Sequence, residues 1–194
     1  MGRDFNNENI VYSASQGDAR AFSELVREHT TLVYRVALRM LGDGGAQDAS
    51  QEVWIRVWRS INNFRGDSAF STWLYKITMN TCLNIREKEL RRERWELRED
   101  LPYLPELDGN FESNPEATTL SRERKDELLV ALQQLRPEHR AALVLRHLEE
   151  LSYREISEIL DIPQGTAKVW ASRGRAALLV ILAGEADEGN GDGR

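Results

Sequence analysis

The sequence has little of the chemistry that holds small secreted or metal-dependent proteins together. One cysteine, Cys82, among 194 residues excludes an internal disulfide framework. The three histidines are scattered and share no metal-ligand spacing with that cysteine, so neither a metal nor another cofactor is expected. No apolar run approaches the roughly 18 residues that span a bilayer, and the N-terminus lacks a signal pattern. These absences predict a cytoplasmic protein that does not insert into a membrane.

The alternation of polar and apolar residues that is typical of strands is also missing. Helical periodicity fills most of the chain instead. Asp18 can cap a helix over about residues 19–41, which the glycines at 42–45 are expected to end. A second helix is expected over about residues 47–61, and a long one from about residue 70 into the charged stretch REKELRRERWELRE. The pattern predicts an all-α fold.

The net charge of −6 is unevenly distributed along the chain. The counts give +2 for residues 1–98, −6 for 99–116, +1 for 117–183 and −3 for 184–194. The strongly acidic stretch also holds three prolines, as an extended linker does. The two remaining blocks are nearly neutral and release few counterions, so the protein is not expected to act on DNA alone.

These boundaries predict two helical domains joined by an acidic, proline-containing linker. The expected units are a first domain at 9–98, the linker at 99–117, a second domain at 118–183 and a disordered tail at 184–194.

The second domain contains the pattern of a helix-turn-helix. Ser152 and Glu155 match the S-x-x-E capping box, so a helix should begin at Tyr153. The turn DIPQG follows, and a second helix is expected over about residues 164–182. Two short helices with a tight turn, the second carrying polar and basic residues, are typical of a DNA-reading unit. The alternative is an ordinary helical hairpin with a solvated basic face.

Helical angles divide the second of these helices into two faces. The small residues Ala167, Ala171 and Gly174 fall on one side with Leu178 and should pack inward. The outward candidates for contacts with bases are Thr166, Val169, Ser172 and Arg173, with Lys168 and Arg175 placed for phosphates. Val169 suits a thymine methyl group. Trp170 lies at the edge of the inward side, where it either fills volume beside the alanines or contacts the DNA backbone.

In the first domain, the segment DASQEVWIRVWRS predicts an amphipathic helix. The expected core residues are Val53, Trp54, Val57, Trp58 and Ile61, and the opposite face holds Asp48, Glu52, Ile55, Arg56 and Arg59. An apolar Ile55 among charged residues indicates a protein contact. A solvated face with one isolated isoleucine is the alternative, because exposed apolar residues are common.

The next segment, SAFSTWLYKITMN, and the loop before it carry residues suited to unpaired bases. A buried stripe is expected at Phe70, Leu74, Ile77 and Ile85, and the other side holds Thr72, Trp73, Lys76, Met79, Asn80 and Leu83. A ring can stack on a base, a lysine can bind phosphate and an amide can read a base edge. Trp73 could equally be a core residue. In the loop, Phe64 and Arg65 either hold a flipped-out base or pack the turn.

Taken in order, these segments resemble the extracytoplasmic-function class of bacterial RNA polymerase sigma factors, over about residues 9–183. The resemblance rests on AFSELVREHTTLVYRVALRMLGD, then QDASQEVWIRVWRSINNFRGDSAFSTWLYKITMN, then LQQLRPEHRAALVLRHLEELSYREISEILDIPQGTAK. It implies a non-enzymatic protein that binds core RNA polymerase, directs it to promoter DNA and helps to melt it. It also implies an anti-sigma factor as a partner, and no small-molecule substrate.

The resemblance implies a role for each matching residue. Those expected to bind the polymerase are Asp48, Gln51, Glu52 and Arg56, with Ile55 on the same face. Those expected at the −10 element are Phe64, Arg65, Thr72, Trp73, Tyr75, Lys76 and Asn80. Those expected at the −35 element are Gly165, Thr166, Lys168, Arg173 and Arg175, which Val169 and Ser172 join from the helical angles. The acidic linker corresponds to a segment threaded through the polymerase, where its charge would mimic RNA.

Two other classes of protein were considered. A stand-alone helix-turn-helix regulator would have a receiver or ligand domain in front, which WLYKITMN and QEVWIRVW do not resemble. A helical nuclease would need a cluster of metal-binding carboxylates, and none is visible in the sequence. The redox role of Cys82 stays open, with a small buried core residue as the favoured interpretation.

Overall fold

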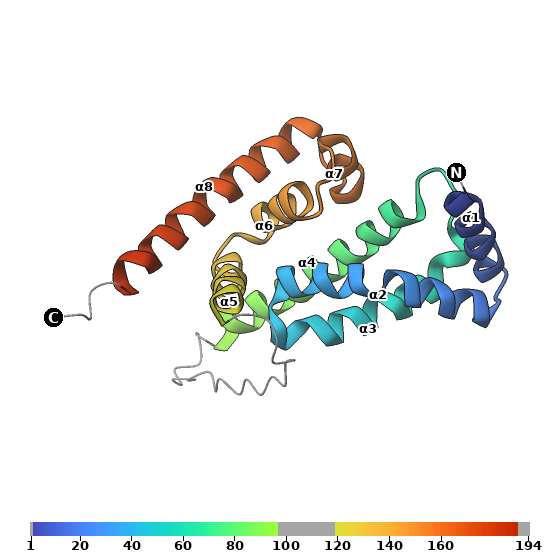
Figure 1. Cartoon of the computed structure of the whole chain (residues 1–194), viewed down its shortest axis with the longest axis horizontal. Coiled ribbons are helices and arrows are strands. Elements are labelled where there is room, and N and C mark those ends of the chain that lie inside the picture. Colours follow the sequence, from blue (N-terminus) through green and yellow to red (C-terminus); the bar gives the residue numbers. More distant parts are fainter. Residues whose placement is uncertain (1, 97–118, 190–194) are drawn as a thin grey trace.

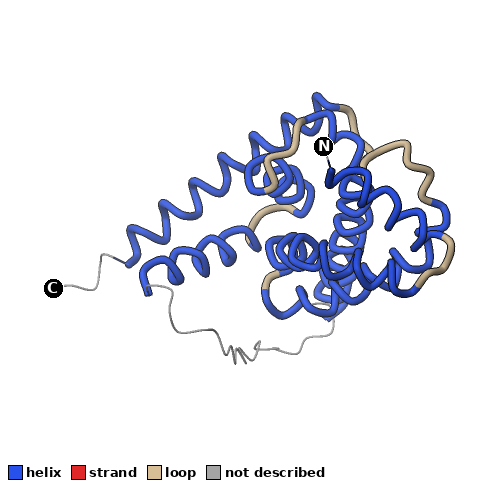
Figure 2. The backbone as a smooth tube through the Cα atoms, turned by 45° about the vertical axis from the view of Figure 1, so that its right-hand side comes forward, coloured by secondary structure: helices blue, strands red, loops and turns tan. Residues whose placement is uncertain are grey.

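The computed structural model describes residues 2–96 and 119–189, which form helices and short connections with no strand among them (Figure 2). The N-terminal part consists of α1 (Gly2–Ser15), α2 (Ala19–Leu41), α3 (Asp43–Ser60), the 3-10 turn η1 (Ile61–Asn63) and α4 (Phe70–Glu96). The C-terminal part consists of α5 (Thr119–Gln133), α6 (Pro137–Leu143), the π-helical turn η2 (Val144–Leu148), α7 (Tyr153–Leu160) and α8 (Gln164–Gly189). The predicted all-α architecture is confirmed. The predicted linker at 99–117 lies outside the described residues.

The break between α2 and α3 is shorter than predicted. Asp18 caps α2 as expected, because its carboxylate accepts hydrogen bonds from the backbone N–H groups of Arg20 and Ala21. Gly42 alone separates α2 from α3, with a positive φ of 73° that favours glycine. Gly44 and Gly45 belong to α3, which begins at Asp43, so the predicted start of this helix at about residue 47 was wrong. A single residue that can adopt positive φ is enough to redirect the chain.

Two helical segments were also misjudged at the ends of the chain. α1 begins at Gly2, before the predicted start of the first domain at residue 9. α8 continues to Gly189, so residues 184–189 are helical and the predicted disordered tail was wrong over that stretch. Alanine and glutamate favour helix in this stretch despite its glycines, and no proline interrupts it.

The helices α2, α3 and α4 lie side by side, with α1 across one end (Figure 1). Their shared core contains Leu25 and Val33 of α2, Val53 and Val57 of α3, and Leu74 of α4, all fully buried. Val53 and Val57 lie four positions apart and Leu25 and Val33 eight, so each pair lies on one face of its helix. This packing holds α4 and the loop before it in a fixed position.

A second core joins the N-terminal part to the C-terminal part. It contains Met40 of α2, Met79 and Cys82 of α4, and Leu145 and Ile156 of the C-terminal half, all buried. α4 is therefore buried on two faces: one meets α2 and α3, and the other meets α6 and α7. The prediction that Met79 lies on an exposed face was wrong for this reason.

The helix-turn-helix forms as the local sequence predicts. The Ser152 hydroxyl accepts from the backbone N–H of Glu155, and the Glu155 carboxylate accepts from the backbone N–H of Ser152, which completes the capping box. Asp161 ends α7 in a left-handed conformation, and α8 begins at Gln164. Ile156 and Ile159 of α7 are buried against Ala167 of α8 and the rest of the second core. This fixes the angle at which α8 presents its outer face.

Candidate functional site

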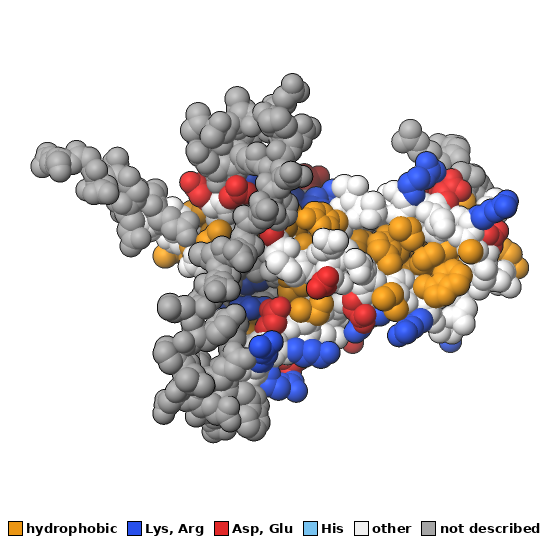
Figure 3. Space-filling view, turned by 90° about the horizontal axis from the view of Figure 1, so that it is seen from below, with side chains coloured by type: hydrophobic (Ala, Val, Ile, Leu, Met, Phe, Trp, Pro, Cys, Tyr) orange, Lys and Arg blue, Asp and Glu red, His pale blue; other side chains and the backbone are white. Residues whose placement is uncertain are grey.

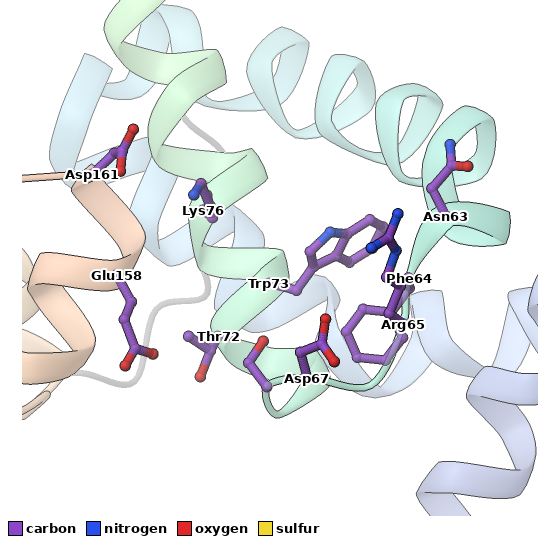
Figure 4. A pocket seen from close by; sticks show the side chains of 10 residues that line it. Asn63, Phe64, Arg65, Asp67, Thr72, Trp73, Lys76, Glu158 and Asp161 are labelled. Carbon is purple, nitrogen blue, oxygen red and sulfur yellow. The ribbon is translucent and has the colours of Figure 1, made fainter.

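The loop between η1 and α4 forms one wall of an open groove of about 580 Å³ (Figure 4). The first turns of α4 form a second wall, with Thr72, Trp73 and Lys76 facing the groove. Arg65 lies on the loop and is exposed. The structure thus brings together five of the seven residues predicted for the −10 element: Phe64, Arg65, Thr72, Trp73 and Lys76.

The aromatic residues of this groove stack on one another. The Phe64 ring lies 5.7 Å from that of Phe70 in a T-shaped arrangement and 5.3 Å from that of Trp73. Phe64 and Trp73 are each partly buried, so part of each ring stays open to the groove. Such a pair adds stability to the loop beyond the area it buries. Packing and base contact are therefore compatible for both residues.

Two residues predicted for the −10 element lie outside the groove lining. Asn80 is exposed further along α4. Tyr75 is only 7% exposed, and its hydroxyl donates a hydrogen bond of 2.6 Å to the Glu149 carboxylate. Burial, followed by the hydrogen bond to Glu149, raises the pKa of Tyr75. In this conformation Tyr75 serves the contact between the two halves.

That contact contains residues that sequence reasoning missed. The Glu149 side chain is 1% exposed and accepts hydrogen bonds from Arg35, Arg39 and Tyr75. The Arg35 guanidinium binds both carboxylate oxygens, at 2.8 and 2.5 Å. This hydrogen bonding raises the pKa of Arg35, whereas burial lowers that of Arg39. No local pattern could have found the cluster, because Glu149 lies more than 70 positions along the chain from each of its three partners.

A buried arginine supports the same contact. Arg140 of α6 is fully buried, and its guanidinium donates to the backbone oxygens of Met40, Gln133 and Leu135 and to Gln133 Oε1. Burial is the main cause that lowers the pKa of Arg140, to about 10. Its two terminal nitrogens find acceptors, which lowers the cost of burying the cation, whereas its Nε has no hydrogen-bond partner among the described residues. Arg140 therefore ties the end of α2 to α5 and α6.

The outer face of α3 carries the residues predicted to bind the polymerase. Asp48 and Gln51 are exposed, Ile55 is 44% exposed, and Arg56 Nε donates to Glu52 Oε1 at 2.7 Å. Apolar side chains gather on the underside of the molecule, where α3 lies, with basic and acidic groups around them (Figure 3). The arrangement is that of an apolar contact with a polar rim.

The prediction that Trp58 is a core residue was wrong. It is 44% exposed, and one edge packs on Phe22 with ring centroids 4.7 Å apart. It lies at the edge of the inner stripe, next to the buried Val57, and on the side toward the solvent. Trp58 therefore adds a large apolar surface to α3 that the sequence had placed inside.

The face of α8 predicted to read DNA is open to solvent. Ala167, Ala171 and Gly174 are buried as predicted, and Lys168, Ser172, Arg173 and Arg175 are exposed, as is Gly165. Val169 is 45% exposed, Thr166 is half-buried and Trp170 is partly buried at the edge between the two sides. The basic residues are thus all accessible in the N-terminal half of α8, the part of the helix that enters the major groove in this motif.

Two further findings bear on the nature of the site. Among the described residues, no group of three or more His, Cys, Asp or Glu side chains is placed to hold a metal ion. No helix in the described ranges is both long and apolar enough to cross a membrane.

Comparisons with known protein families match both halves of the chain. Residues 25–96 match the model of Sigma-70 region 2, and residues 125–178 match that of Sigma-70 region 4. The class defined by the fold and the two faces is thus that of the sigma factors.

Relatives define the subgroup. The ECF RNA polymerase sigma-E factor of Escherichia coli strain K12 is 34% identical over 190 residues, which cover 92% of this chain and 95% of that protein. The protein of the same name from Haemophilus influenzae is 34% identical over 183 residues, covering 90% and 94%. The chain belongs to the extracytoplasmic-function sigma factors. It is accordingly a transcription initiation factor and not an enzyme, and its partners are core RNA polymerase and promoter DNA.

Solved structures show the same fold. CnrH, in complex with the cytosolic domain of CnrY, matches with a TM-score of 0.64 at 19% identity, covering 92% of this chain and 97% of CnrH. The sigma factor RpoE from Bartonella quintana, in complex with the anti-sigma factor NepR, matches with a TM-score of 0.60 at 20% identity, covering 85% and 98%.

Proposed function

We propose that this sigma factor holds core polymerase through the outer face of α3 and reads promoters with two separate sites. The groove of Phe64, Arg65, Thr72, Trp73 and Lys76 binds and helps to melt the −10 element, with Asn80 as a further contact. The basic face of α8 binds the −35 element. The protein acts in the cytoplasm, where polymerase and DNA meet, and an anti-sigma factor regulates it, as the complex of the sigma factor RpoE with the anti-sigma factor NepR suggests by analogy.

The groove is the observation that carries this proposal. It places aromatic rings, a lysine and an arginine around one open volume at the start of a rigid helix. Aromatic stacking with nearby cations suits an unpaired strand better than a duplex. An unpaired strand exists only after melting, so the geometry of the groove supports a role in binding the melted element.

The roles of the α3 face, the groove and the α8 face can be tested separately, with variants that should leave the folds of both halves intact. Ile55→Arg on α3 should weaken binding to core polymerase and leave DNA contacts unchanged. Lys76→Ala should leave polymerase binding unchanged and reduce open-complex formation. Lys168→Ala should reduce binding of the holoenzyme to duplex promoter to a similar extent for every promoter sequence, because phosphate contacts carry no sequence information.

Glu28→Gln on the exposed part of α2 is the control, since it lies in none of the three faces. Equal loss of polymerase binding in Ile55→Arg and Lys76→Ala, with normal melting curves, would contradict this division of roles.

A further inference from the structure

The C-terminal half of α8 exposes a group of apolar side chains. Val180 is 73% exposed, more than any other large apolar residue in the described ranges, and the neighbouring Leu179 is 58% exposed. Ala176 and Ala183, about one turn before and after Val180, are exposed as well. We call these four residues the α8 patch. α8 lies along the outer edge of the C-terminal part, and α5, α6 and α7 pack against its inner side (Figure 1). A contiguous apolar patch of this kind indicates an interaction surface.

Two charged positions frame the α8 patch at equal distances. Arg173 precedes Val180 by seven residues, and Asp187 follows it by seven. Seven residues make almost two helical turns, so both positions fall on the face of α8 that carries Val180. Along the helix this face is therefore basic, then apolar, then acidic, with Val180 at its centre. Such an order of charges is complementary to its own reverse.

A second copy of the chain, laid antiparallel, matches this pattern. With a two-fold axis at Val180, Arg173 of each copy lies beside the partner's Asp187, and the two Val180 side chains meet at the axis. The small Ala176 and Ala183 allow the two helices to approach closely. A parallel pair would instead bring like charges together at both ends, which is unfavourable. The charges thus select both the occupant of the α8 patch and its orientation.

We propose that two copies of this sigma factor associate through the outer face of α8, antiparallel and centred on Val180, with Arg173 opposite the partner's Asp187. The contact is one helix wide, so the dimer is weak and reversible, with a dissociation constant on the order of ten micromolar. The pairing does not rest on the promoter contacts proposed for α8, although it uses the same Arg173.

Sedimentation velocity of the full chain, from well below to well above this concentration, measures the association. The wild type should shift from monomer to dimer. Val180→Asp should raise the dissociation constant by about ten-fold or more, because it places two carboxylates at the axis. Val130→Asp is the matched control, since Val130 is a valine of α5 with 58% exposure outside the α8 patch. It should associate like the wild type. Circular dichroism melts check that each variant remains folded.

An exchange of charges tests the orientation. Arg173→Asp and Asp187→Arg should each weaken the dimer about ten-fold, because each replaces two attractions by two repulsions. The variant with both changes should regain the affinity of the wild type, because the same pairs then form with their signs exchanged. Loss of fold or of DNA binding cannot produce this recovery.

Arg175→Asp is the control for the charge variants. Arg175 is exposed on the same helix, but five residues from Val180 it points about 140° away from the paired face. Reversing its charge should leave the association nearly unchanged.

Cross-linking tests the position of the axis. Cys82 is buried, so Val180→Cys introduces an accessible thiol into a chain whose own thiol is covered. A disulfide requires two Cα atoms within about 7 Å, which the two-fold axis provides at this position. With a mild oxidant such as diamide, native Val180→Cys should form a linked dimer, and Val130→Cys should stay mostly unlinked.

The outcomes separate the proposal from its alternatives. A wild type that stays monomeric at concentrations on the order of a hundred micromolar would overturn the dimer, since even a small interface of this kind should then be filled. Association that survives Val180→Asp, or a double charge variant no better than either single one, would overturn the antiparallel register. Val180→Asp should also bind core polymerase like the wild type. A loss there, in a chain that does not self-associate, would assign the α8 patch to the polymerase instead.

Discussion

Gly174 lies where α8 crosses α6, and its missing side chain is what allows the two backbones to approach. A Cβ atom placed there would lie 2.7 Å from the His139 carbonyl oxygen and 3.1 Å from Leu143 Cβ. The first of these neighbours is backbone and cannot move aside as a side-chain tip would. The packing of the recognition helix thus depends on one residue.

Gly174→Ala should therefore destabilise the protein by about 1–3 kcal/mol, the usual cost of overpacking a well-filled core. Gly184→Ala is the matched control: it lies in the same helix with nothing within 4 Å of the added Cβ. The control should be neutral or slightly stabilising, because alanine favours helix. Urea unfolding of both variants decides the matter, and an equally stable Gly174→Ala would contradict the close approach.

The burial of Cys82 makes its thiol unreactive in the folded protein. It is fully buried on α4, and burial raises the pKa of its thiol to about 12. Below that pH the thiol stays protonated, and only the thiolate is a strong nucleophile. The structure supports the interpretation of Cys82 as a core residue and gives no sign of a redox switch.

Native protein at pH 8 should therefore react with a thiol reagent such as Ellman's far more slowly than protein unfolded in urea. The ratio of the two rates is the measurement. Rapid stoichiometric labelling of the folded chain would contradict the burial of this thiol.

At the scale of the helix, the capping box of α7 links sequence to stability most directly. Hydrogen bonds from the Ser152 hydroxyl and backbone lower the pKa of Glu155 below its ordinary value. A carboxylate with a lowered pKa stabilises the folded state above the pKa of the unfolded chain. That contribution is lost as the pH falls through the folded pKa.

Ser152→Ala should cost about 1 kcal/mol, as loss of an N-cap commonly does. The difference from wild type should be largest near neutral pH and shrink in acid, once Glu155 is protonated. Ser172→Ala, on the exposed face of α8, should be nearly neutral at every pH. Chemical denaturation at several pH values tests both statements, and a cost that grows in acid would contradict the sign.

Trp170 on α8 remains open between two roles. It is partly buried beside Ala167 and Ala171, which suits packing, but its exposed part is close to the DNA-reading face. We expect packing to dominate, so Trp170→Phe should lower stability modestly and leave binding to duplex promoter by the holoenzyme nearly unchanged. A large loss of binding without loss of stability would show that the ring contacts DNA.

The helices themselves could mostly be predicted from sequence, and particular residues show why. Asp18 and Ser152 are N-cap residues, which mark the start of a helix from the local sequence alone. The spacing of Val53 and Val57 defines the inner face of α3 without knowledge of the helices that pack against it. Met79, Tyr75 and Trp58 show the limit. Helical angles separate two sides of a helix, but α4 is buried on both sides. Trp58 lies on α3, at the margin between its buried and its exposed side. Which partner covers the second face depends on contacts more than 70 residues apart.

At the scale of the whole molecule, the groove was largely predictable and its closure was not. Thr72, Trp73 and Lys76 follow one another on a single helix, so their common face could be read from the sequence. The opposing Glu158 and Asp161 come from the other half, and so does Glu149, which binds Arg35 and Arg39. Ion pairs between distant segments produce no periodic pattern in the sequence. The sequence therefore did not indicate that Arg35 and Arg39 form ion pairs.

The charge distribution fits a protein that depends on its polymerase. Each half is close to neutral, and the recognition helix exposes only three cations among its described side chains, Lys168, Arg173 and Arg175. With few phosphate contacts, affinity for DNA is low and depends weakly on salt. Promoter binding therefore needs both DNA sites held together on the enzyme.

The central claim is that this chain gives core polymerase the ability to start transcription at specific promoters. The most direct test is run-off transcription with purified core polymerase, with and without the full chain, on a library of promoter fragments. The account predicts transcripts from a limited set of fragments, only in the presence of the chain, and far fewer with Lys76→Ala. Absence of any transcript that depends on the chain would contradict it.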